Sequence, residues 1–209
     1  VHRAGQARWC LPGFDPAPAL AAAGAVDGPP ELAFEEDLAV LDTASGTIPW
    51  LCVCVPSHWA PEDKLGKSLA AIHGPVADGA ALGAAMPALT RLLADGGHWE
   101  RFVWTITPSG RYDQHPRRHP RLPWPDAPDP AEFAARCFLR AERQTFLPVP
   151  GRQQVVFTIR VMLQPLAQAV QSPQQAARLH DSLASMTPEV LQYKNLSGAR
   201  AALLAWLAA

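Results

Sequence analysis

The sequence lacks the cysteine spacings that metal centres and redox dithiols use. Its 209 residues include four cysteines, Cys10, Cys52, Cys54 and Cys137, and no two of them form a C-x-x-C pair. Cys52 and Cys54 form a C-x-C, and a strand would turn both thiols to the same side. This spacing argues against a zinc knuckle, a ferredoxin-type cluster or a redox motif. Reduced thiols in a cytoplasmic protein are the simplest interpretation.

The sequence also lacks an excess of basic charge and a long apolar run. The formal net charge is −1, so nothing in the composition suggests a nucleic acid as partner. The longest apolar runs are far shorter than the roughly 20 residues that span a membrane. The first residues lack the apolar region of a signal peptide. We therefore expect a folded, cytoplasmic protein that binds neither a membrane nor a nucleic acid.

Basic residues gather in one proline-interrupted cluster, RYDQHPRRHPR, at residues 111–121. We interpret this cluster as a solvated loop, with an anion-binding or partner-binding patch as the alternative. Its two histidines, His115 and His119, are expected to be exposed.

The order of the predicted elements indicates an α+β fold. Residues 37–57 contain two apolar, β-prone runs around a Thr/Ser/Gly turn and predict a hairpin. Further strands are predicted within 98–110 and 138–166. Helices are predicted at 61–73, 80–95 and 131–137, and after the Ser-Pro and Thr-Pro pairs that begin at 172 and 187. We expect a mainly antiparallel sheet of about five strands with helices on one side, in a domain of residues 34–209 that follows an irregular extension at 1–33.

The segment that begins at Pro61 predicts an amphipathic helix that ends in His73. His73 falls on the apolar face of this helix, and Gly74 and Pro75 end the helix directly after it. A histidine satisfied within the core is one interpretation, and a ligand or catalytic group is the other. Neutral imidazole binds metals and serves as an axial ligand of haem. Haem iron suits a lone histidine better than zinc does, because no second or third ligand is nearby in the sequence.

An arginine on the apolar side of a predicted strand also needs an explanation. Strand alternation places Arg143 among apolar side chains, where a guanidinium requires an anionic partner. An internal Asp or Glu, a haem propionate or a substrate carboxylate would serve. Arg101 and Arg160 are similar cases on less apolar faces. Trp59 and Trp104 are interpreted as core residues, with contact to a cofactor as the alternative.

Several segments together resemble the haem-dependent oxidative N-demethylase family, whose known member is the α subunit of a dimethylamine monooxygenase. The similarity runs from about Phe34 to about Leu207. The segments that carry it, in chain order, are VCVPSHWAPEDKLGKSLAAIHGPV, HWERFVWTI, LRAERQTF, VVFTIRVMLQPL and YKNL.

The resemblance implies a PAS-like fold, in which a curved antiparallel sheet with helices encloses a b-type haem. In that family an axial histidine holds the iron, and the Ile-His-x-Pro-Val match makes His73 the candidate metal ligand. Arg101, Trp104 and Arg143 are the further candidate contacts of the haem. Glu142, Arg143 and Arg160 are the candidate catalytic residues, as polar groups that would polarise bound oxygen.

The implied activity is a monooxygenase reaction on a small amine, in which O2 is used to remove an N-methyl group as formaldehyde. The implied electron source is NADPH, through flavin and a [2Fe–2S] centre on other subunits. The sequence itself contains no Gly-rich dinucleotide fingerprint and no cysteine set for such a cluster. Two other classes stay open: a haem-binding PAS sensor of gas or redox state without turnover, and a haem-free accessory subunit.

Overall fold

The computed structural model describes residues 7–24, 28–74 and 79–209 and divides the chain into two compact units. Each unit is assembled from separate stretches of sequence. The first unit consists of Val1–Val103, Tyr112–Pro120 and Glu142–Val161, and the second of Trp104–Arg111, Arg121–Ala141 and Met162–Ala209.

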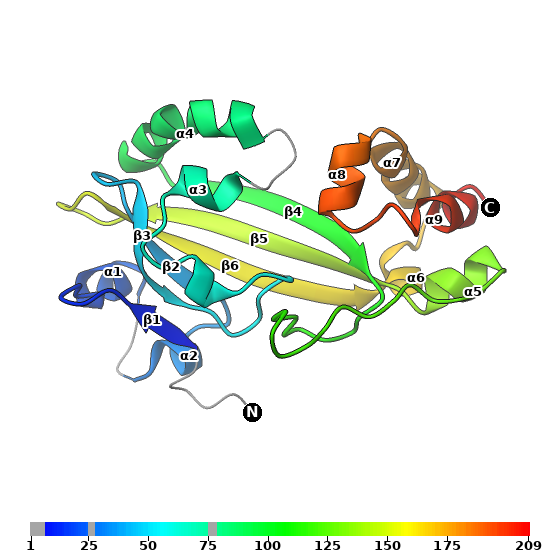
Figure 1. The fold of residues 1–209 in the computed structure, drawn as a ribbon, viewed down its shortest axis with the longest axis horizontal. Helices are drawn as coiled ribbons and strands as arrows, with labels where there is room; N and C mark the ends of the chain where they lie inside the picture. Colours follow the sequence, from blue (N-terminus) through cyan, green and yellow to red (C-terminus); the bar gives the residue numbers. More distant parts are fainter. Residues whose placement is uncertain (1–6, 25–27, 75–78) are drawn as a thin grey trace. The chain divides into compact units, whose positions relative to one another are not determined.

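In the described part of the chain, six strands form one antiparallel sheet in the order β1-β3-β2-β6-β5-β4 (Figure 1). The strands are β1 Arg8–Cys10, β2 Asp37–Asp42, β3 Thr47–Cys52, β4 Trp99–Thr107, β5 Phe138–Pro148 and β6 Gln154–Pro165. The expected α+β class with an antiparallel sheet is confirmed. The sheet has six strands rather than about five, because β1 joins it from the N-terminal segment. A PAS-like fold that encloses haem stays a prediction.

The helices follow the strands in chain order. They are α1 Ala17–Ala22, α2 Pro30–Ala33, α3 Leu69–His73, α4 Gly79–Ala94, α5 Pro130–Ala135, α6 Leu166–Ala169, α7 Pro173–Ala184, α8 Pro188–Tyr193 and α9 Arg200–Leu207, with a 3-10 turn at Pro61–Asp63. Among the described residues, none of these helices is both long and apolar enough to cross a membrane.

The N-terminal segment has more structure than its Ala/Pro/Gly-rich composition suggested. β1 pairs antiparallel with β3, with Trp9 opposite Leu51. Ala19 of α1 is fully buried against the sheet. Residues 8–24 are therefore not irregular, because their apolar side chains have a sheet edge and a sheet face to cover. Residues 1–6 and 25–27 of the expected extension lie outside the described residues.

The predicted helix over residues 61–73 is wrong, because the chain forms two short pieces there. Gly66 adopts a φ of +71°, a left-handed conformation that interrupts a helix. The Gly66 amide donates to the Ile48 carbonyl at 2.7 Å, so this stretch bonds to the β2–β3 hairpin instead of to itself. Ser68 then caps α3, because its hydroxyl accepts from the Ala71 amide at 3.2 Å.

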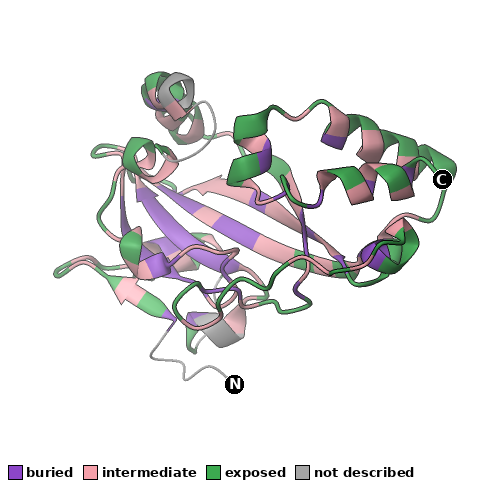
Figure 2. Ribbon diagram, turned by 45° about the vertical axis from the view of Figure 1, so that its right-hand side comes forward, coloured by how far each residue is buried: buried purple, intermediate pink, exposed green. Residues whose placement is uncertain are grey.

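In the first unit, each face of the sheet carries its own core. Figure 2 shows buried residues along the strands of the sheet. One face packs around Leu38, Val40, Trp50, Cys52, Val149 and Val156, with Ala19 of α1. The other face packs around Ala39, Ile48, Leu51 and Val53, with Leu69 and Ile72 of α3. We call this second side the α3 face. It includes Phe157 of β6, which stacks on Phe146 of β5 at 4.6 Å between ring centroids.

The second unit has a core of its own, built from α5 to α9 and strand ends. Its fully buried apolar residues include Leu166, Leu183, Leu196 and Leu203. The predicted helix starts are confirmed: the side chains of Asp129, Ser172 and Thr187 cap α5, α7 and α8. In each case a proline follows in the first turn, where its missing N–H costs nothing.

Candidate functional site

His73 lies at the end of α3 with one of its ring nitrogens already bonded. Its Nδ1 is 2.7 Å from the Leu69 carbonyl oxygen. A carbonyl can only accept, so Nδ1 carries the proton and Nε2 keeps its lone pair. This is the tautomer that a metal-ligating histidine needs. Pro75, which was expected to end the helix, lies outside the described residues.

The charge state of His73 also suits a ligand. Burial lowers the pKa of His73, and the positive charges of Arg101 and Lys64 lower it further, against the opposing hydrogen bond to Leu69. The imidazole is therefore neutral at neutral pH. The side chain is partly buried. Both interpretations of His73, as a satisfied core histidine and as a ligand, stay predictions.

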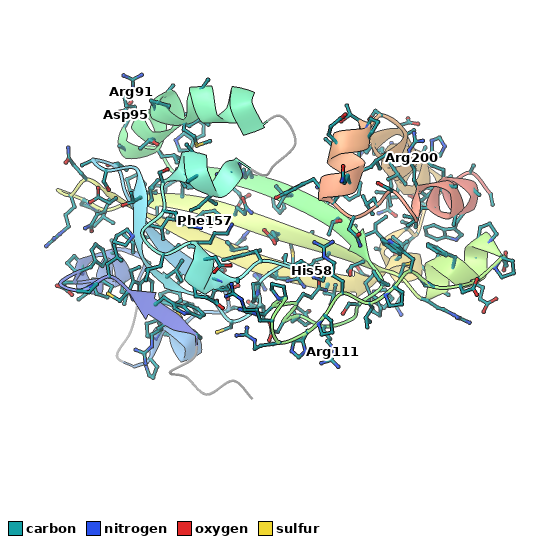
Figure 3. The ribbon with its side chains drawn as sticks, viewed as in Figure 1. His58, Arg91, Asp95, Arg111, Phe157 and Arg200 are labelled. Carbon is teal, nitrogen blue, oxygen red and sulfur yellow. The ribbon has the colours of Figure 1, made fainter. Side chains whose placement is uncertain are left out.

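The helix that carries His73 packs on a core that an aromatic side chain also covers. Leu69 and Ile72 of α3 pack against this core, and so does Phe157, which Figure 3 labels. Phe157 stacks on Phe146, and the Arg101 guanidinium lies over the Phe146 ring at 5.8 Å from its centroid. Arg101 thus belongs to the same face as α3, in line with its electrostatic effect on His73.

A line of polar side chains continues from Arg101 along the α3 face. Arg101 Nε donates to Gln144 Oε1 at 2.7 Å, and Gln144 Nε2 donates to Glu142 Oε2 at 2.7 Å. The Ser57 hydroxyl donates to the other Glu142 oxygen. Glu142 and Gln144 lie on one side of β5 because side chains alternate along a strand. Sequence analysis had singled out Arg101 and Glu142 but not the residues that link them.

The segment around Ser57 is held in an uncommon backbone conformation. The Gln114 amide donates to the Pro56 carbonyl at 3.0 Å, and Ser57 and Gln114 form a parallel bridge. The next residue, His58 (Figure 3), has a φ of +60°. A left-handed residue other than glycine is uncommon and is typical of sites where the surrounding structure imposes a conformation. Here the imposed conformation brings Ser57 to Glu142.

Arg143 lies on the opposite side of β5 from Glu142. Its guanidinium forms ion pairs with Glu36 at 3.4 Å and with Glu100 at 3.7 Å. Of the anionic partners considered for Arg143, the internal carboxylate is the one that the structure supplies.

Arg160 follows the same pattern. Thr145 and Thr158 are hydrogen-bonded to each other, so the Arg143 side of β5 and the Arg160 side of β6 form one face. Arg160 pairs there with Glu35 at 2.7 Å. The structure therefore does not bring Arg143 and Arg160 together with Glu142.

The two tryptophans considered as cofactor contacts are partly buried and pack against hydrophobic cores. Trp59 packs against the core of the α3 face in the first unit. Trp104 packs against the core of the second unit. Lys194, from the YKNL segment, donates to the Trp104 carbonyl at 2.6 Å and lies 5.6 Å from the ring centroid. Contact of Trp104 with a cofactor stays a prediction.

The basic cluster at 111–121 is exposed at Arg111, Arg117 and Arg121, as expected of a solvated loop, but its residues 114 and 115 are buried in the first unit. His115, expected to be exposed, is 2% exposed, and its Nε2 lies 3.0 Å from Glu62. Its Nδ1 accepts from the Arg117 amide, so Nε2 is the donor. The Arg117 guanidinium pairs with Glu62 and Asp63. Burial raises the pKa of Glu62, but the hydrogen bonds from His115 and Arg117 outweigh it, so the pKa is lowered.

The residues of the α3 face fit a b-type haem. Haem needs a nitrogen ligand for iron, apolar surface for the macrocycle and cations for its carboxylates. His73 offers the Nε2 lone pair, and Phe146 and Phe157 offer aromatic surface. Arg101 and Lys64 bring positive charge near the imidazole.

The fold is that of an α+β protein, and His73 is the candidate ligand on one face of its sheet. Comparison with families of known proteins identifies the family more closely. Residues 32–204 match the family described as haem-dependent oxidative N-demethylase, alpha subunit-like, and the chain belongs to this family. The resemblance found in the sequence is thereby confirmed. The description links the family to haem-dependent oxidation and to an assembly of more than one subunit.

Three residues of the candidate site were not predicted from the sequence: Ser57, Gln144 and Phe146. Ser57 and Gln144 stand inside the segments PSHW and ERQT that carried the resemblance. The available signal was strand alternation, which places residues 142, 144 and 146 on one side of β5. Ser57 gave no such signal, because its approach to Glu142 depends on a loop conformation.

Proposed function

We propose that this chain is the haem-binding subunit of a monooxygenase that removes an N-methyl group from a small amine. The family membership supports haem-dependent oxidation. The observation that carries the proposal for this chain is the hydrogen bond between His73 Nδ1 and the Leu69 carbonyl. It leaves Nε2 as the ligating nitrogen of a neutral imidazole.

In this proposal each residue of the α3 face has a defined task. His73 Nε2 binds the iron, and Leu69 fixes the ring orientation through its carbonyl. Arg101, assisted by Lys64, supplies positive charge for the carboxylates of the haem. The bound haem supplies the capacity to activate O2. Glu142 is the candidate catalytic residue on this face, whereas Arg143 and Arg160 are assigned to ion pairs on the other.

The proposed reaction balances with a separate electron donor. One oxygen atom of O2 enters the C–H bond of the N-methyl group and gives a carbinolamine. The other oxygen atom leaves as water, with two electrons and two protons. The carbinolamine C–N bond then breaks and gives formaldehyde and the demethylated amine. We propose that NADPH supplies the electrons through flavin and a [2Fe–2S] centre on partner subunits.

An absorption spectrum of the purified chain, titrated with haemin, tests the ligand assignment. Wild type should give a Soret band that saturates at about one haem per chain, and dithionite with CO should shift it. His73→Ala should lose or shift the band. His98→Ala is the matched control, because His98 is exposed and lies outside the site. Unchanged uptake by His73→Ala would overturn the ligand assignment.

Measurements on the same purified chain distinguish the proposed monooxygenase from a haem-binding sensor and from a haem-free accessory subunit. Failure of wild type to bind haem would favour a haem-free accessory subunit. Haem binding without amine-dependent O2 consumption, in the presence of a reductant, would favour a sensor. Formaldehyde released in proportion to O2 consumed would support the monooxygenase.

A further inference from the structure

The carboxylate of Glu142 is partly buried, yet among the described residues it accepts hydrogen bonds only from neutral groups. Ser57 donates its hydroxyl to Oε1, and Gln144 donates its amide nitrogen to Oε2 at 2.7 Å. No ion pair of Glu142 occurs within the described part of the chain.

Two other partly buried glutamates of the first unit, Glu36 and Glu62, are neutralised directly. Glu36 pairs with Arg143, and Glu62 pairs with Arg117 and His115. Removing a carboxylate from water is costly unless a cation or several donors compensate it. Glu142 differs from these two glutamates in having no ion pair with a described residue.

The nearest cation along the polar line is kept one residue away from Glu142. Arg101 Nε donates to Gln144 Oε1, so the amide oxygen of Gln144 is committed to Arg101. The amide nitrogen must then face Glu142, and the orientation of the amide follows from the network. Gln144 is 7% exposed, so this buried amide acts as a spacer between the two charges.

We propose that Glu142 is the anion that binds the protonated amine of the substrate. A carboxylate has about four acceptor positions, and two of those on Glu142 are used by Ser57 and Gln144. A secondary ammonium ion brings a positive charge and two N–H donors, which match the two remaining positions. A tertiary ammonium brings one donor and a quaternary ammonium none, so affinity should fall in that order.

The location of Glu142 agrees with this role. Glu142 is joined through Gln144 to Arg101, and the Arg101 guanidinium lies over the ring of Phe146. All four residues belong to the first unit and to its α3 face. The inference rests on the proposed function only in taking a small amine as the substrate, because ammonium binding can be measured without turnover.

Isothermal titration of the full chain, loaded with haem, with dimethylammonium chloride tests the assignment. Glu142→Gln removes the charge and keeps the size of the side chain. It should weaken binding by about tenfold to a hundredfold, the range that a charge-assisted hydrogen bond supports. It should leave the Soret stoichiometry unchanged. Glu100→Gln is the matched control, since Glu100 pairs with Arg143 on the other face of the sheet.

Equal affinity of Glu142→Gln and wild type would overturn the assignment, and so would loss of haem from this variant. Wild type that binds haem but no ammonium would overturn it while leaving the haem function intact. If the variant does not fold, titration of the wild type with a series of methylated ammonium ions tests the proposal instead. Affinity that falls from dimethylammonium to trimethylammonium to tetramethylammonium supports the proposal, and equal affinity for the uncharged dimethyl ether overturns it.

Discussion

Asp37 offers a sharp test of how the chain positions the loop that leads to Ser57. Its carboxylate is 3% exposed and accepts from the Cys54 amide at 2.6 Å. It also accepts from the Val55 amide, with one oxygen at 3.3 Å and the other at 3.2 Å. Asp37 thus ties the start of β2 to the chain that leaves β3, two residues before Ser57.

Substitution of Asp37 by Asn should destabilise the first unit. Hydrogen bonds to a charged acceptor contribute roughly 1.5–3 kcal/mol each, and the amide retains only one accepting oxygen. The NH2 group of the asparagine would also face the N–H of Val55. Both groups are donors, so no hydrogen bond could form between them. We expect a loss of about 2–4 kcal/mol, which lowers Tm by roughly 5–15 °C in a chain of this size.

Thermal unfolding followed by circular dichroism measures the loss, and hydrogen exchange of the Cys54 and Val55 amides locates it. Asp42→Asn is the matched control on the same strand. Asp42 Oδ1 accepts from the Ser45 amide at 2.8 Å near solvent, and an Asn oxygen can keep this bond. If Asp37→Asn melts within about 2 °C of wild type and both amides exchange as slowly as before, the reasoning is refuted.

Two further predictions concern the second unit and the thiols. Burial raises the pKa of Cys137 to about 11, so at pH 8 this thiol stays protonated and should resist iodoacetamide, whereas the exposed Cys10 should be alkylated. Peptide mass spectrometry of the native protein decides this, and equal labelling of both would contradict it. A Cβ at Gly110 would lie 2.8 Å from the ring of Phe138, so Gly110→Ala should cost about 1–3 kcal/mol in a chemical denaturation series. An unchanged midpoint would show that the ring moves aside freely.

Helices and strands were predicted correctly where the structure of a short stretch depends mainly on its own residues. Asp129 followed by a proline predicted the start of α5, and its carboxylate accepts from the first amides of that helix. The β2–β3 hairpin and the long strands were predicted for the same reason, because alternation and turn residues are local. The helix predicted over residues 61–73 was wrong because of a tertiary hydrogen bond. The Gly66 amide donates to the Ile48 carbonyl, and this partner cannot be predicted from helical periodicity.

The candidate site was predictable only as far as its residues stand in recognisable segments. His73 was found from its position on the apolar face of a predicted helix, and Glu142 because the segment around it resembles a family. The contacts of Arg143 could not be predicted, because they depend on which distant carboxylates the fold brings to it. Alternation gave the opposite faces, but only the structure showed Glu36 against Arg143.

The two faces of the first unit's sheet handle charge in different ways, and this difference is the main guide to function. On one face Arg143 and Arg160 meet glutamates directly. On the α3 face Gln144 stands between Arg101 and Glu142, so a cation and an anion are both held without contact between them. A purely structural pair would gain stability by closing that gap. Keeping the two charges apart suits a site that receives one group with carboxylates beside His73 and another with a positive charge beside Glu142.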